Sequence, residues 1–158
     1  MIVDPPIQAQ IDLYQGRAPG FVNIYNTLSM WTSIKRAFDA LEVDVDHRPD
    51  LVVRSRWDFY ADQVPALITT PSLVIPMEPY KHPATFHYQQ QFLVSQQDVF
   101  TYGSYDAVER YCGVIDNLEE VLRGDSTLPF ISEYFSVAHL WTQQVGYYTP
   151  TMAFTLVR

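Results

Sequence analysis

The stretch DLVVRSRWDFYAD, residues 50–62, decides the fold of this chain, because a short apolar run changes abruptly into charged residues. The apolar run at 51–53 predicts a strand buried on both faces. Such strands are typically parallel and lie inside an α/β layer, where ligands bind beyond the carboxyl ends of the strands. The sequence therefore predicts a pocket with Arg54, Arg56 and Asp58 at its rim.

The same charges have a second interpretation, in which they form structural ion pairs where the strand ends. This segment alone favours neither role. The choice depends on the rest of the chain.

Outside this stretch, the pattern predicts alternating helices and strands. Asn26 is a candidate cap for a helix to about Glu42, and Ser104 for a second helix that ends near Gly124. Pro129 can begin a last helix. Strands are expected at 72–76, before Tyr102, at 145–148 and at 152–157. Residues 1–20 are predicted to be an irregular lead and residues 77–91 a polar loop, because both contain prolines.

Composition fits a single α/β domain over residues 1–158. Hydrophobic residues make up 47% of the 158 residues and charged residues 18%, which argues against disorder. Aromatic residues make up 15%, more than a core usually needs, so some rings are expected to line a groove or an interface.

Charge and cysteine content exclude several classes of protein. The net charge of −8 argues against binding to nucleic acid, which needs clustered Lys and Arg. The single Cys112 excludes an intramolecular disulfide and favours a reducing compartment, so we expect a cytoplasmic protein. No segment reaches the roughly 18 to 20 apolar residues that span a bilayer.

Three segments carry a family resemblance. Arg54-Ser-Arg56-Trp-Asp58 resembles the V-I-R-x-R-x-D signature of GT-A-like glycosyltransferases found in bacterial polysaccharide loci and in large viruses. Residues 97–104, QDVFTYGS, resemble the element N-D-Q-F-x-x-G-S, and Glu133 with His139-Leu140 resembles P-E-x-x-L-x-x-H-L. The likeness spans residues 25–158. The departures from these motifs are at Gln97, Val99, Ser132 and Ser136.

The resemblance implies a partial GT-A-like, Rossmann-like fold: a mixed sheet flanked by helices, without the N-terminal βαβ portion of relatives. Three explanations of that missing portion stay open. The chain is a fragment, or one half of a protein split over two polypeptides, or a reduced descendant that binds without catalysing. A homo-oligomer or a partner chain could supply the missing half.

The resemblance also implies roles for individual residues. Arg54 and Arg56 would bind the diphosphate of a nucleotide-sugar donor, and Asp58 would bind phosphate or a divalent cation, Mn²⁺ or Mg²⁺. Asp98 is the candidate catalytic base, with a loop-fixing role as its alternative. Glu133 is expected to face the cleft as a second catalytic residue, and His139 is either a structural group or a metal ligand.

The leading hypothesis is therefore a glycosyltransferase-like domain that moves a sugar from a nucleotide-sugar donor to a glycan or polysaccharide acceptor. The alternative is a non-catalytic carbohydrate-binding or assembly protein derived from the same fold. A third possibility is a structural subunit that pairs with a partner chain.

Overall fold

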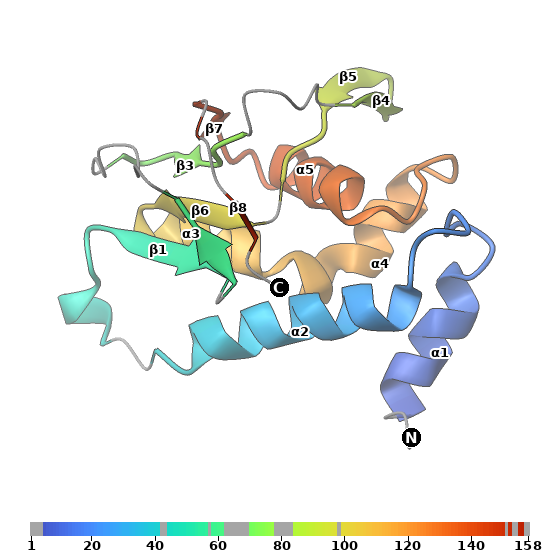
Figure 1. Cartoon of the computed structure of the whole chain (residues 1–158), viewed down its shortest axis with the longest axis horizontal. Coiled ribbons are helices and arrows are strands. Elements are labelled where there is room, and N and C mark those ends of the chain that lie inside the picture. The colour runs from blue at the N-terminus through green and yellow to red at the C-terminus, as the bar shows by residue number, and fades with distance from the viewer. Residues whose placement is uncertain are drawn as a thin grey trace.

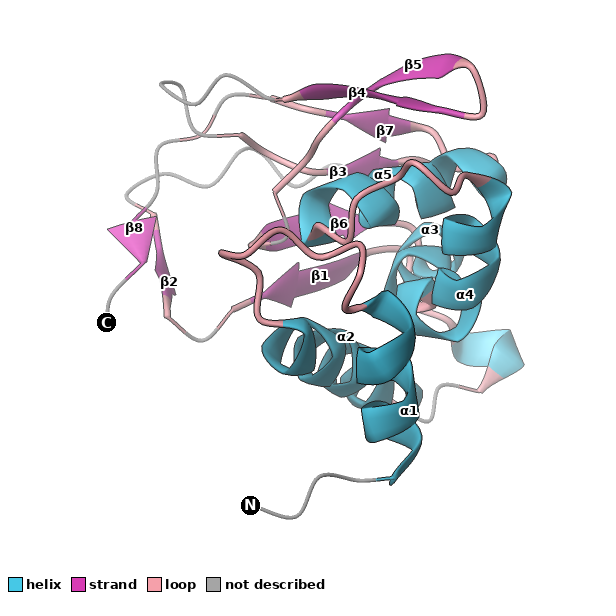
Figure 2. Cartoon of the chain, turned by 90° about the vertical axis from the view of Figure 1, so that its right-hand side faces the viewer, coloured by secondary structure: helices cyan, strands magenta, loops and turns pink. Residues whose placement is uncertain are grey.

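The computed structural model describes residues 5–41, 44–56, 58–61, 70–77, 84–97, 99–150, 152 and 155–156. Over these residues, helices pack against a four-stranded mixed sheet (Figure 1). Figure 2 shows the helices gathered on one side of the molecule and the small β2–β8 pair on the other. The α/β class predicted from the sequence is confirmed.

The central sheet has the strand order β1-β6-β3-β7. Its strands are β1 (Val52–Ser55), β6 (Phe100–Gly103), β3 (Leu73–Val74) and β7 (Tyr147–Tyr148). β6 is antiparallel to both β1 and β3, and β3 is parallel to β7. Two short antiparallel pairs accompany this sheet: β2 (Phe59–Tyr60) with β8 (Thr155–Leu156), and β4 (Thr85–Tyr88) with β5 (Gln91–Val94).

The prediction of a parallel strand buried on both faces is wrong for β1. The strand is antiparallel to β6 and lies at the end of the sheet order. Its residues alternate between half-buried and exposed, and Val53 is 44% exposed. Three consecutive apolar residues do not distinguish a central strand from an edge strand that has one well-covered face.

The helix α2 (Ile24–Asp39) confirms the predicted helix with a shift of two to three residues. Its cap is Asn23 rather than Asn26, because the Asn23 side chain accepts a hydrogen bond of 3.0 Å from the Asn26 backbone N–H. Leu28 and Trp31 are completely buried and anchor the helix in the core.

The second predicted helix is divided in two. Ser104 caps α3 (Tyr105–Cys112) by accepting from the Ala107 N–H at 3.3 Å, as predicted. A turn at Gly113 then separates α3 from α4 (Val114–Gly124). The last helix, α5 (Ser132–Thr142), begins three residues after Pro129.

The prediction of an irregular lead over residues 1–20 is wrong for its central part, which forms α1 (Pro5–Tyr14). Tyr14 is buried and stacks on Phe130, with ring centroids 5.1 Å apart. This contact joins the first helix to the segment before α5.

Residues 77–91 were predicted to form a polar loop, but the part from Thr85 onward belongs to the β4–β5 hairpin. Phe86 in β4 stacks on Tyr134 in α5 with a centroid distance of 4.5 Å and an interplanar angle of 2°. The hairpin therefore packs on α5 through its aromatic face. His87 lies on β4, and His82 falls outside the described residues.

Candidate functional site

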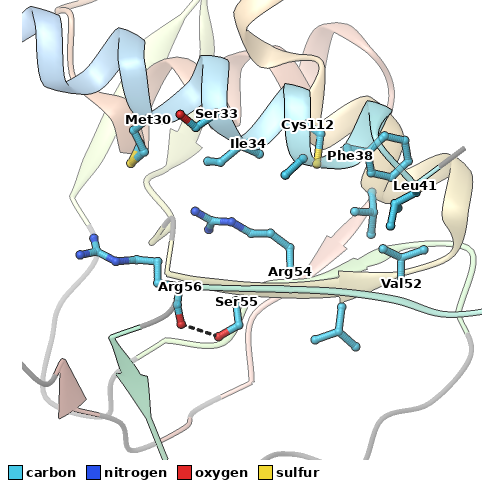
Figure 3. Close-up of a pocket in the computed structure, with 13 residues that line it drawn as sticks. Met30, Ser33, Ile34, Phe38, Leu41, Val52, Arg54, Ser55, Arg56 and Cys112 are labelled. Atoms are coloured by element: carbon cyan, nitrogen blue, oxygen red, sulfur yellow. Dashed lines mark hydrogen bonds between the residues drawn. The ribbon is translucent and has the colours of Figure 1, made fainter.

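A pocket of about 800 Å³ lies between α2 and β1 (Figure 3). α2 and the residues just after it contribute one wall, β1 and Arg56 contribute the opposite wall, and α3 closes the inner end. The lining residues are Met30, Ser33, Ile34, Ala37, Phe38, Leu41, Val52, Val53, Arg54, Ser55, Arg56, Val108 and Cys112.

The register of β1 places Arg54 in this pocket. Val52 is opposite Gly103 and Arg54 is opposite Thr101, whereas Val53 is opposite Tyr102. Side chains alternate between the two faces of a strand, so Val52 and Arg54 share the face that α2 covers. Figure 3 shows the Arg54 side chain extending from β1 toward α2.

The charged residues among the described lining of the pocket are basic, in contrast to the acidic composition of the chain. Arg54 and Arg56 line the pocket, and none of its described lining residues is acidic, although the chain carries a net charge of −8. Arg54 extends into this partly enclosed space, which favours an anionic ligand because its attraction is screened less there than at the open surface.

Arg56 and Asp58 form a two-pronged ion pair. Arg56 Nε donates to Asp58 Oδ1 at 2.9 Å, and Arg56 Nη2 donates to Asp58 Oδ2 at 2.7 Å. The Asp58 carboxylate is buried, whereas the Arg56 side chain is 36% exposed. The Arg56 backbone N–H also donates to the Val99 carbonyl at 3.2 Å. The structural interpretation of these charges is therefore correct for this pair, and the pair fixes the direction of Arg56.

These contacts do not suit a divalent cation at Asp58. Both of its carboxylate oxygens accept from Arg56, and the adjacent positive charge opposes a second cation. In the part of the chain that the structure describes, no three His, Cys, Asp or Glu side chains are grouped as a metal site would require. The described residues thus do not fit the Mn²⁺ or Mg²⁺ expected from the resemblance.

His139 is buried in α5 and is not one of the lining residues of the pocket. Its Nε2 donates to the Arg110 carbonyl at 2.7 Å, which assigns the ring proton to Nε2 because a carbonyl can only accept. Burial lowers the pKa of His139 below its usual value and keeps the ring neutral. This arrangement matches the structural role among the two that the sequence left open.

Glu133 lies in the first turn of α5, beside Ser132, whose Oγ accepts from Trp31 Nε1 at 3.0 Å. This bond holds the start of α5 against the middle of α2. Glu133 is not among the described lining residues of the pocket, and Asp98 falls outside the described residues. Of the predicted site residues, Arg54 and Arg56 line the pocket, and Asp58 is held next to them through Arg56.

The α2 wall is the part of the site that sequence reasoning missed. None of the α2 lining residues Met30, Ser33, Ile34, Ala37 and Phe38 was predicted to belong to a site. A signal was nevertheless present, because Ser33 and Ala37 are small residues spaced four apart on one helical face. Small side chains at that spacing leave room between a helix and the sheet that it covers.

Cys112 lines the inner end of the pocket as a buried thiol. Burial raises its pKa to about 12, although the nearby Arg54 partly opposes the shift. The thiol is therefore protonated at neutral pH and contributes an apolar surface rather than a nucleophile.

A comparison of this sequence with protein-family models and with curated proteins finds no match. Among the described helices, none combines the length and the apolar character needed to cross a bilayer.

Proposed function

We propose that this chain is a glycosyltransferase-like domain that binds the diphosphate of a nucleotide-sugar donor at Arg54 and Arg56. The observation that carries the proposal is the pair of arginines lining a pocket at the end of β1, with no acidic group among the described lining residues. The resemblance gives the acceptor class as a glycan or polysaccharide. The partial GT-A-like fold belongs to the same proposal and is supported by the mixed sheet.

The arginines suit the chemistry of donor cleavage. When a sugar leaves a nucleotide diphosphate, negative charge develops on the departing phosphate oxygens, and positioned cations stabilise it. A guanidinium group presents several N–H donors in a plane that matches phosphate geometry. Asp58 holds Arg56 in place through Nε and Nη2 and balances its charge, so Arg54 is the main phosphate contact in this proposal. No step of this proposal passes through a metal ion.

A second candidate function is binding without catalysis. It is favoured by one specific observation: the described lining residues include cations and apolar groups but no carboxylate that could act as a base. Asp98 remains the predicted base for a hydroxyl acceptor, and it falls outside the described residues.

Calorimetric titration of the purified chain with UDP and with GDP, each with and without Mn²⁺, tests the donor site. We expect one of the two nucleotides to bind with an affinity that Mn²⁺ does not change. Arg54→Gln should weaken binding about tenfold or more, because a charge-assisted hydrogen bond contributes about 1.5–3 kcal/mol. The matched control is Arg36→Gln, which removes the same charge from an exposed position of α2.

Absence of binding by both nucleotides would refute the donor site. Binding that requires Mn²⁺ would instead restore a metal role for Asp58. Release of nucleoside diphosphate from a bound nucleotide-sugar would then separate a transferase from a binding protein.

A further inference from the structure

The pocket between α2 and β1 is cationic at one place and apolar over most of its wall. Its α2 side presents Met30, Ile34 and Phe38, and the inner end is closed by Val108 and by the protonated Cys112 thiol. Ser33 and Ser55 are the uncharged polar residues of the described lining. A ligand that fills this space therefore needs an extended apolar body and few hydrogen-bonding groups.

The positive charge of the pocket is confined to its β1 side. Arg54 extends from the strand toward α2, and Arg56 follows it along the rim (Figure 3). A sugar chain does not match this surface, because its hydroxyl groups would lose hydrogen bonds to water against the apolar α2 wall. A hydrocarbon chain with an anionic end matches both parts.

We infer that the α2–β1 pocket binds an amphiphile with a hydrocarbon chain and a phosphate monoester head, and that this amphiphile is the sugar acceptor. The chain lies along Met30, Ile34 and Phe38, and the head contacts Arg54. The acceptor role rests on the proposed glycosyltransferase function, whereas binding of the amphiphile does not. This acceptor class differs from the glycan implied by the resemblance, because the pocket wall is apolar.

The reaction balances without a base. A phosphate oxygen of the amphiphile attacks the anomeric carbon of the donor sugar. The bond from that carbon to the diphosphate oxygen breaks, and its electron pair leaves with the nucleoside diphosphate. A phosphate monoester is largely a dianion at neutral pH, since its second pKa is about 6, so no proton has to be removed from the attacking oxygen. This agrees with a pocket whose described lining has cations and no carboxylate.

Arg54 can serve both anions in this arrangement. The Arg54 guanidinium lies between the apolar part of the pocket and Arg56, so in this proposal it lies next to the acceptor head on one side and the donor diphosphate on the other. Donor and acceptor are therefore expected to bind at the same time rather than in competition.

Titration with hexyl, octyl and decyl phosphate, each below its micelle concentration, tests the pocket directly. We expect affinity to rise up to about fourfold for each added methylene that is buried, until the pocket is full. Inorganic phosphate and decanol, which supply the head and the chain separately, should each bind far more weakly than decyl phosphate. Equal affinities across the chain-length series would overturn the inference.

Two variants measure separately how much the phosphate head and the hydrocarbon chain contribute to the affinity. Arg54→Gln should weaken all three alkyl phosphates about tenfold without changing the increment per methylene. Ala37→Phe places a ring in the apolar part of the pocket and should abolish the chain-length dependence. Ala37 is exposed, so this variant is expected to fold, as circular dichroism would verify. Arg36→Gln is the charge-matched control and should bind like the unaltered chain. Unchanged chain-length dependence in Ala37→Phe would place the ligand elsewhere.

A titration of decyl phosphate in the presence of saturating UDP or GDP tests the acceptor role. Simultaneous binding is expected, and competition would make the amphiphile an occupant of the donor site and overturn that role. Nucleotide binding without alkyl phosphate binding would refute this inference alone. Alkyl phosphate binding without nucleotide binding would refute the donor site and, with it, the acceptor role.

Discussion

Asp58 forms a structural ion pair, and this pair fixes the direction of Arg56, which lines the pocket. The charged stretch was interpreted either as the rim of a ligand site or as a structural ion pair. The Asp58 carboxylate is 6% exposed and accepts two hydrogen bonds from Arg56. An acid that is buried and paired in this way costs stability when its charge is removed, since the Arg56 contact is lost while the polar group stays buried.

Asp58→Asn is therefore expected to lower the free energy of unfolding by about 1–2 kcal/mol, a range reduced for solvent screening at the partly exposed Arg56. Urea denaturation measures the change. The control is Asp106→Asn, which breaks the more exposed Arg48–Asp106 pair and should cost less than about 1 kcal/mol. A stable Asp58→Asn protein that has lost nucleotide binding would instead make Asp58 a direct ligand contact.

His139 makes the stability of the protein depend on pH. Burial lowers its pKa in the folded state from 6.5, the usual value, while contacts with the Arg110 carbonyl and the charges of Asp116 and Glu120 oppose this shift. Between the lowered folded pKa and about 6.5 the unfolded chain binds more protons than the folded chain does. The stability contributed by neutral His139 is thus complete above pH 6.5 and is lost as the pH falls through the folded pKa.

We expect the urea midpoint to fall between pH 7.5 and pH 5.5, and His139→Gln to reduce that fall. His47→Gln should keep the fall, because the His47 side chain is 81% exposed. A pH dependence that survives in His139→Gln would assign it to other groups. Both variants can be measured by the same denaturation series.

At the scale of elements, the turn of the β4–β5 hairpin could not be predicted from its two residues, Gln89 and Gln90. Gln89 and Gln90 have φ of 46° and 66°, in the left-handed region that favours glycine or asparagine. Gln-Gln gives no turn signal, and the prolines earlier in residues 77–91 led to the prediction of a loop. Contacts outside the turn hold it: Tyr88 Oη donates to the Val121 carbonyl and the Gln89 N–H donates to Asp125, both at 3.1 Å.

Gln90→Gly should stabilise the protein by about 1 kcal/mol, because glycine adopts a positive φ without the steric penalty of a side chain. Thermal unfolding would show a higher midpoint. Gln91→Gly, one residue further and inside β5, should lower the midpoint instead. A lower midpoint for Gln90→Gly would mean that the Gln90 side chain makes a stabilising contact.

The helices were the most predictable elements, and their interruptions were the least. The helix predicted from Asn26 to about Glu42 corresponds to α2, and Ser104 was correctly identified as the cap of α3. No interruption at Gly113 was predicted, so one helix was expected where two exist. Pro5 and Pro6 favoured an irregular segment, yet they occupy the first turn of α1. Backbone N–H groups in the first turn have no hydrogen-bond partner within the helix, so proline is tolerated there.

At the scale of the whole molecule, sequence reasoning found one wall of the pocket and missed the other. The arginines were recognisable because charge follows an apolar run along the chain. The α2 wall depends on how closely the helix approaches β1, and that distance is set by contacts elsewhere, such as the Trp31–Ser132 hydrogen bond. Strand order was also beyond prediction, because β3, β6 and β7 lie far apart in the sequence.

The register of β1 also determines which kinds of genetic change the site can tolerate. A substitution of Arg54 changes one side chain, and the other side chains of β1 still point to the same faces of the sheet as before. Losing a single codon between Pro49 and Val52, with the strand pairing kept, reverses odd and even positions along the strand. The Val53 side chain then turns to the face that α2 covers, and Arg54 meets the apolar cluster of Val74, Phe100, Tyr102 and Met152. A deletion of one residue in this segment is therefore expected to disturb the site more than a substitution of one residue.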